Sequence, residues 1–174
     1  MNYGEIKKND IANGEGVRTS LFVSGCRHHC KNCFNRDTWD VGFGELFTEK
    51  TMEEIFSACE PNWINGLSLL GGEPFEPENQ KVLLPFLIMF KERFPDKTIW
   101  CYSGFTFEEI IGKLNSRAFT NTSTEMLGLI DVLVDGRFVE EKKDISLVFR
   151  GSSNQRVIDV KKSLDSGSVV LYLE

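Results

Sequence analysis

The chain has 174 residues, the usual length of one domain, and its hydrophobic content of 41% is sufficient for a buried core. A formal net charge of −6 without a stripe of lysine and arginine argues against nucleic-acid binding, and no apolar run is long enough to span a bilayer. The first ten residues lack the apolar core of a signal peptide. We therefore expect one cytoplasmic domain over residues 1–174 with no nucleic-acid or membrane partner.

Short apolar runs alternate with helical patterns along the chain. Thr48 is the predicted N-cap of the first helix, and the polar stretch 115–124 is a predicted loop. The predicted strands, in chain order, are 19–24, 66–70, 98–102, 130–134, 145–149, 156–160 and 168–173, with a D-S-G turn between the last two. The predicted helices are 48–59, 78–94 and 106–114.

This alternation predicts an α/β fold built from βαβ units. A complete eight-fold barrel takes about 250 residues, which this chain does not have. We therefore expect a partial, open (β/α) barrel of about six parallel strands with antiparallel C-terminal strands. A cysteine-rich loop and the sequences G-G-E-P, S-G and D-G-R each follow a predicted strand. Because α/β folds carry their sites at the carboxyl ends of the strands, these four features should surround one opening.

Three of the five cysteines lie close together in the sequence G-C-R-H-H-C-K-N-C-F-N. An odd number of cysteines without an export signal argues against a disulfide framework. Cys59 and Cys101 lie in apolar patterns and are expected to be small buried residues. The other three, Cys26, Cys30 and Cys33, have the spacing C-x3-C-x2-C. Thiolates at this spacing favour zinc, copper(I) or an iron–sulfur cluster.

The absence of a fourth cysteine in this motif helps to distinguish between zinc and an iron–sulfur cluster. Structural zinc takes four protein ligands, and the fourth could be His28, His29 or a distant residue. Histidines between ligands are, however, more often packing or hydrogen-bonding residues. A 4Fe–4S cluster held by three cysteines has one open iron, at which a substrate or cofactor can bind. The spacing therefore favours a catalytic cluster.

The same residues resemble a known family. The stretch 13–33 is similar to the opening of glycyl-radical activating enzymes, a branch of the radical S-adenosylmethionine family. Their pattern is roughly G-x-G-x-R-x3-F-x2-G-C-x3-C-x2-C, and G-G-E-P follows at the end of the next strand. The short length and the tail F-R-G-S-S-N-Q-R look most like activases of anaerobic ribonucleoside-triphosphate reductase. The resemblance covers about residues 10–161, and its matching positions outside the cysteines are Gly14, Gly16, Arg18, Phe22, Gly25 and 71–74.

The resemblance implies a truncated barrel that carries one 4Fe–4S cluster and S-adenosylmethionine. Cys26, Cys30 and Cys33 would each hold one iron, and the open iron would hold the cofactor. One electron, from a donor such as flavodoxin, would cleave the cofactor to a 5′-deoxyadenosyl radical. That radical would remove a hydrogen atom from a glycine of the partner, an anaerobic ribonucleoside-triphosphate reductase. The chemistry belongs to cluster and cofactor, and the protein orients them.

The resemblance also implies cofactor-binding side chains at the other strand ends. Arg18 is expected to orient the cysteine loop or the partner peptide. Two departures from the family are Asn32, where an aromatic residue is common, and the absence of enough cysteines for a second cluster. The expected cofactor-binding residues are Gly71, Gly72, Glu73, Ser103, Asp135, Arg137 and Asn154.

Three other functions remain open from the sequence. One is another small radical S-adenosylmethionine enzyme, such as a deazaguanine synthase, although the G-x-G-x-R stretch favours an activase. The second is a zinc-stabilised, non-enzymatic binding module with Cys3His ligation. The third is a redox-sensing thiol protein.

Overall fold

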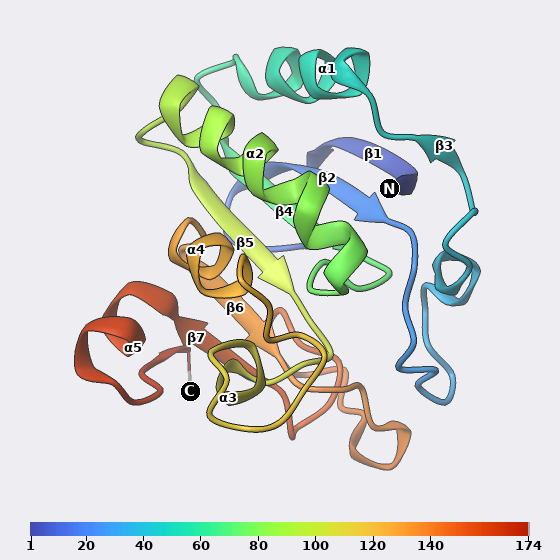
Figure 1. Cartoon of the computed structure of the whole chain (residues 1–174), viewed down its shortest axis with the longest axis vertical. Helices are drawn as coiled ribbons and strands as arrows, with labels where there is room; N and C mark the ends of the chain where they lie inside the picture. Colours follow the sequence, from blue (N-terminus) through green and yellow to red (C-terminus); the bar gives the residue numbers. More distant parts are fainter. Residues whose placement is uncertain (174) are drawn as a thin grey trace.

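The computed structural model describes residues 1–173, in which eight strands form one mixed sheet (Figure 1). Their order across the sheet is β3-β1-β2-β4-β5-β6-β7-β8. The strands are β1 (Asn2–Asp10), β2 (Val17–Val23), β3 (Glu45–Leu46), β4 (Ile64–Gly71), β5 (Thr98–Tyr102), β6 (Val132–Asp135), β7 (Arg156–Asp159) and β8 (Leu171–Leu173).

Parallel pairing joins only four strands, and the predicted partial barrel of about six parallel strands is wrong. β2, β4, β5 and β6 are parallel neighbours in that order. β1 pairs antiparallel with β2 and β3, and β7 pairs antiparallel with β6 and β8. A parallel neighbour requires a crossover, usually a helix. Since β1 turns back into β2 through residues 11–16, and β6 returns as β7 through 136–155 without an α-helix, both connections reverse the chain direction.

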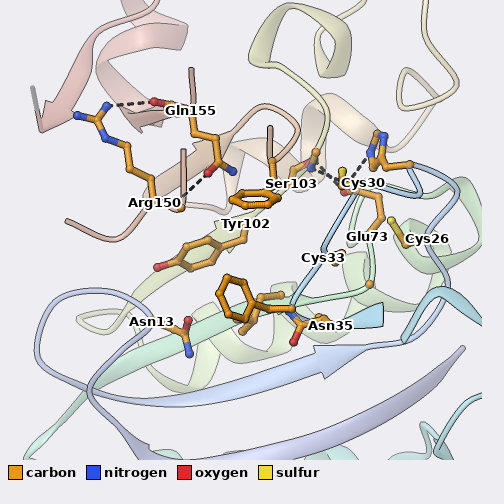
Figure 2. A pocket seen from close by; sticks show the side chains of 18 of the residues that line it. Asn13, Cys26, Cys30, Cys33, Asn35, Glu73, Tyr102, Ser103, Arg150 and Gln155 are labelled. Atoms are coloured by element: carbon orange, nitrogen blue, oxygen red, sulfur yellow. Dashed lines mark hydrogen bonds and ion pairs between the residues drawn. The ribbon is translucent and has the colours of Figure 1, made fainter. Parts of the chain in front are cut away.

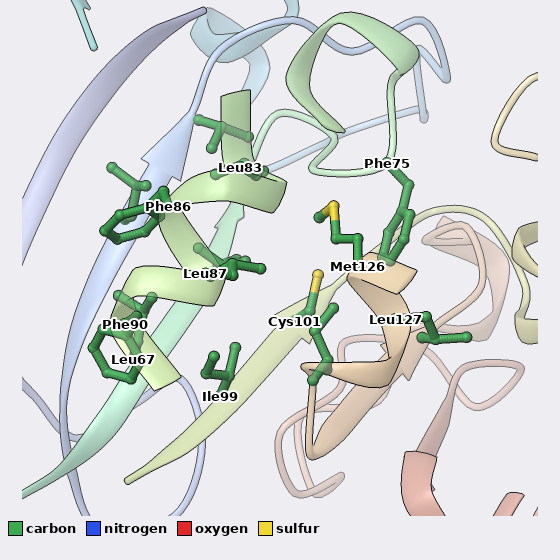
Figure 3. Close-up of a cluster of buried hydrophobic side chains, with 14 of the residues drawn as sticks. Leu67, Phe75, Leu83, Phe86, Leu87, Phe90, Ile99, Cys101, Met126 and Leu127 are labelled. Atoms are coloured by element: carbon green, nitrogen blue, oxygen red, sulfur yellow. The ribbon is translucent and has the colours of Figure 1, made fainter. Parts of the chain in front are cut away.

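The helices pack against one face of the central strands, and together they form the larger of two apolar clusters (Figures 1 and 3). Phe86 and Phe90 of α2 lie there with Leu67 of β4, Ile99 of β5 and Met126 of α4. Within residues 1–173, no helix combines the length and the apolar character needed to cross a membrane. The α-helices are α1 (Glu49–Cys59), α2 (Pro77–Arg93), α3 (Phe107–Ile110), α4 (Ser123–Gly128) and α5 (Val160–Ser166), with short 3-10 helices at Arg36–Trp39 and Glu140–Lys142.

The opposite face of the sheet carries a second, smaller cluster around Trp100. Val132, Val134 and Val157 belong to it, because alternate residues of a strand point to opposite faces. Phe149, from the loop 136–155, lies edge-on to Trp100 with ring centroids 5.0 Å apart. That loop therefore covers part of the face that the helices leave free.

Most predicted elements of the parallel region are confirmed, and the errors lie in the connection from β5 to β6 and in the C-terminal part of the chain. The helix predicted at 106–114 is only α3 (Phe107–Ile110), and 145–149 forms turns and bends instead of a strand. α5 occupies part of the segment where only a turn was expected, and α4 begins in the predicted loop 115–124. Asp159 caps α5 by accepting from the Lys162 N–H, and Gly167 ends it in the left-handed conformation.

Candidate functional site

A cavity of about 670 Å³ lies beside the carboxyl ends of β2, β4 and β5. All three clustered cysteines line it, as do residues of the G-G-E-P loop and of the loop after β5. The four strand ends expected to share one opening therefore do lie around it, since Gly136 after β6 also lines the cavity. Figure 2 shows the cysteines on one side, with Glu73 and Ser103 beside them, and Asn13, Tyr102, Arg150 and Gln155 farther along the cavity.

The three thiols are partly buried, and all five cysteines of the chain are free. Burial raises the pKa of Cys26 to about 12 and also raises the pKa of Cys30. A redox-sensing or nucleophilic thiol needs a lowered pKa, so Cys26 and Cys30 lack that character without a ligand. A bound metal or cluster supplies the charge that turns such thiols into thiolates.

The cavity fits a group larger than one ion. Within residues 1–173, no three Cys, His, Asp or Glu side chains converge closely enough to hold a single metal ion. A 4Fe–4S cluster takes each thiolate on a different iron and does not need that convergence. Three buried polar atoms that line the cavity have no hydrogen-bond partner, namely His28 Nδ1, Trp39 Nε1 and Tyr102 OH. Unpartnered buried polar atoms are costly, so they indicate that a polar ligand completes this cavity.

The start of the cysteine loop extends the sheet past the end of β2. Gly72 N–H donates to the Val23 carbonyl at 2.7 Å, and Glu73 N–H donates to the Gly25 carbonyl at 2.9 Å. A Cβ atom on Gly72 would lie 2.7 Å from that Gly25 oxygen and 2.9 Å from the Thr38 oxygen. The glycine is therefore required because the cysteine loop passes directly over it.

Glu76, just before α2, anchors the cysteine loop to the rest of the protein. Its carboxylate is 3% exposed, accepts from the Arg27 N–H at 3.0 Å and pairs with the Arg27 guanidinium at 2.7 Å. Arg117 donates to the same carboxylate at 2.8 Å. Burial alone would raise the pKa of Glu76, but the hydrogen bonds from Arg117 and Arg27 outweigh it and lower the pKa below its ordinary 4.5.

Replacing Glu76 with glutamine should lower the free energy of unfolding by about 2 kcal/mol, because buried hydrogen bonds to a charged acceptor are lost. Since the folded-state pKa is lowered, the wild-type advantage is fully present above pH 4.5. It is lost as the pH falls through the folded-state pKa, when the carboxylate takes up a proton in both states. Urea unfolding of both proteins at several pH values measures this difference.

Glu78→Gln is the matched control, because Glu78 also pairs with Arg27, at 2.7 Å, but is 54% exposed. An exposed pair contributes little, so this variant should lose less than about 0.5 kcal/mol. Equal losses in the two variants would contradict the anchoring role of Glu76.

Glu73 and Ser103, two of the expected cofactor-binding residues, are in direct contact. Ser103 Oγ donates to Glu73 Oε1 at 2.8 Å, and both side chains are buried beside the cavity. Gly71 and Gly72 line the cavity as well. The structure thus brings these four residues to the cysteines.

Asp135, Arg137 and Asn154 instead border a neighbouring cavity of about 440 Å³. Asp135 is buried, accepts from the Phe107 N–H at 2.7 Å and forms an ion pair with Arg156. Arg137 is exposed, and its carbonyl accepts from Asn154 Nδ2 at 2.8 Å. The two cavities share Gly104 and Gly136 as lining residues, so these side chains lie next to the main cavity but do not line it.

Several residues have contacts that the sequence does not reveal. Glu76 and Arg117 meet across 41 positions, and His28 contacts a carboxylate 45 positions away. Arg18 was expected to orient the cysteine loop or the partner peptide, but it is the second residue of β2, at the opposite end of that strand from the cysteine loop. It donates to Ser68 and Thr98.

A family model and several known proteins each match most of this chain. A family model described as a 4Fe-4S single cluster domain matches residues 12–158, which confirms the predicted cluster. Anaerobic ribonucleoside-triphosphate reductase-activating proteins are similar over most of both chains. That of Haemophilus influenzae is 41% identical over 89% of this chain and 96% of its own length. Those of phage T4 and Escherichia coli K12 are each 40% identical over 90% of this chain, and over 93% and 97% of their own lengths.

The identity, the coverage and the cluster-binding domain all agree with the motifs that line the cavity. The predicted resemblance to glycyl-radical activases is thereby confirmed. The chain belongs to the family of anaerobic ribonucleoside-triphosphate reductase-activating proteins.

Proposed function

We propose that this protein generates a glycyl radical on an anaerobic ribonucleoside-triphosphate reductase by using a 4Fe–4S cluster and S-adenosylmethionine. The observation that carries this proposal is the placement of three free thiols on one wall of a large cavity that has unpartnered polar atoms. The activity in the names of the relatives supports the same reaction.

Cys26, Cys30 and Cys33 are the proposed cluster ligands, each on one iron. Cys59 and Cys101 are fully buried in the main core, which leaves the fourth iron open to the cofactor. A cluster held by these three cysteines would supply the electron for reductive cleavage of S-adenosylmethionine, which is the source of the radical. The chain's own residues hold these groups, orient them and limit access of water to the cavity.

The proposed cofactor-binding residues fall into two groups. Gly71, Gly72, Glu73 and Ser103 form the wall next to the cysteines. The second group, which borders the neighbouring cavity, is Asp135, Arg137 and Asn154. Arg137 is the cation of this group that is available for the cofactor carboxylate, because Arg156 is committed to Asp135 and Glu108.

The proposal extends to the setting of the reaction. Residues 1–174 would act as one radical S-adenosylmethionine domain, with a flavodoxin-type protein as the electron donor. Free thiols and an oxygen-sensitive open iron require reducing conditions, so we place the reaction in the cytoplasm.

The experiment is an anaerobic reconstitution with iron and sulfide, followed by EPR of the reduced protein with and without S-adenosylmethionine. We expect about four irons per chain and a spectrum that changes when the cofactor is added. Addition of the reductase should then give an organic radical signal located on a glycine of the reductase. Tightly bound zinc, a cluster that does not respond to the cofactor, or a reductase without the radical would overturn the proposal.

A further inference from the structure

The Glu73 carboxylate joins three loops and has no free acceptor position. It is 1% exposed and accepts four hydrogen bonds. Oε1 accepts from the Phe75 N–H at 2.9 Å and from Ser103 Oγ at 2.8 Å, and Oε2 accepts from the Gly104 N–H at 2.7 Å. His28 Nε2 is the fourth partner, 2.9 Å from Oε2. Two carboxylate oxygens offer about four acceptor positions, so all are used.

His28 is built into this junction. Its side chain is 2% exposed, and its ring lies edge-on to Phe105 with centroids 4.4 Å apart. A Cβ atom on Gly104 would lie 2.5 Å from His28 Cδ2, so only glycine at 104 leaves room for the imidazole. Because Nε2 faces the carboxylate, Nε2 carries the proton that is donated. His29 differs, since it is exposed and its ring lies against Trp39.

Apart from the bonds of Arg27 to Glu76, few hydrogen bonds hold the shape of the cysteine loop. In residues 1–173, no N–H from residues 27–32 donates to a backbone carbonyl. Cys26 and Cys30 each lie two positions from His28, so a bond at His28 restrains the backbone that carries both thiols. The bond ties this backbone to the loops after β4 and β5, which form the adjoining part of the cavity wall.

We propose that His28 is a positioning residue. Through its Nε2–H bond to Glu73, it fixes the cysteine loop against the part of the cavity wall that is formed by the loops after β4 and β5. Glu73 then supports cofactor binding through the loops that it joins, because a fifth donor would have to displace one of the four present. The role of the pair in cofactor binding rests on the proposed function, whereas its effect on the loop does not.

The first test uses the protein without its cluster, under reductant, and measures amide hydrogen exchange of residues 26–35. His28→Phe keeps a ring of similar size and removes the donor, and His28→Gln keeps a donor. His29→Asn is the matched control, because asparagine tolerates the left-handed conformation that His29 adopts at φ 50°. We expect exchange about tenfold faster in His28→Phe, near wild type in His28→Gln and unchanged in the control.

The second test measures the dissociation constant for S-adenosylmethionine by EPR titration of the reconstituted proteins at equal iron content. His28→Phe should bind the cofactor about tenfold more weakly than wild type, with His28→Gln restoring affinity. Wild-type exchange and affinity in His28→Phe would overturn the inference while leaving the proposed function intact. A wild-type cluster that ignores the cofactor would instead overturn the proposed function, and the exchange experiment would still decide the role of His28 in the loop.

If His28→Phe does not fold, Glu73→Gln replaces it in the exchange experiment. The glutamine keeps the shape of the side chain but replaces one acceptor oxygen with an NH2 group, which cannot accept from the donors around it. Faster exchange of residues 26–35 in that variant supports the inference, and unchanged exchange contradicts it.

Discussion

Replacing Cys26, Cys30 or Cys33 with serine is expected to reduce cluster iron and glycyl-radical formation to background. Each thiolate is proposed to hold a different iron, and serine is a poor ligand for this soft metal site. No spare thiol is available as a substitute, because Cys59 and Cys101 are fully buried in the core. Iron and sulfide analysis after anaerobic reconstitution measures the first effect, and EPR of the reductase measures the second.

Cys59→Ala and Cys101→Ala are the controls. Both remove a thiol from the main core, so each should cost stability through a small cavity but leave the iron content as in wild type. The cluster assignment would be contradicted if a core variant lost as much iron as the loop variants. It would also fail if any loop variant kept the full cluster and its response to the cofactor.

The parallel part of the fold was predictable because its elements have local signals. The apolar run at β4 is stopped by Gly71 and Gly72, and α1 begins at Thr48, whose side chain accepts from the Thr51 N–H. The rule that sites lie at the carboxyl ends of parallel strands then placed the cysteines beside G-G-E-P. That part of the site follows from sequence order alone.

The remaining parts depend on contacts that no local pattern encodes. β1 is largely polar and is a strand because it pairs with β2 on one side and β3 on the other. Glu76 and His28 acquire their roles from partners more than 40 positions away. Arg137 and Asn154 were assigned from the motif order, but the return of β7 antiparallel to β6 places them at a second cavity. The antiparallel C-terminal strands were predicted, but the position of these two residues relative to the cysteines was not.

Replacing Arg18 with leucine is expected to lower the free energy of unfolding by about 3 kcal/mol. The guanidinium is 1% exposed and donates to Ser68 Oγ, to Thr98 Oγ1 and to the carbonyls of Glu15, Leu67 and Thr98. Burial lowers its pKa to about 10, so the charge itself is costly and leucine removes that cost. The lost bonds outweigh this gain, because buried acceptors are left without donors. Urea unfolding of the cluster-free protein measures the result.

Arg36→Leu is the control for Arg18→Leu, since Arg36 is exposed and its guanidinium lies over the Trp39 ring, 5.5 Å from the ring centroid. Surface substitutions of this kind usually change stability by less than about 0.5 kcal/mol. Arg18→Lys should recover less than half of the loss, because one ammonium group cannot reach all of the acceptors. Equal stability of Arg18→Leu and Arg36→Leu would refute this account.

The effect of Arg18 should extend to one end of the cavity and leave the other intact. Ser68 Oγ, which accepts from Arg18, donates to the Asn13 carbonyl at 2.5 Å, and Asn13 lines the cavity far from the cysteines (Figure 2). The cysteine loop is held independently by Glu73 and Glu76. Arg18→Leu, examined at a temperature where it is folded, should therefore keep its iron but form the glycyl radical more slowly. Loss of iron in parallel with activity would show instead that the two ends of the cavity are coupled through the sheet.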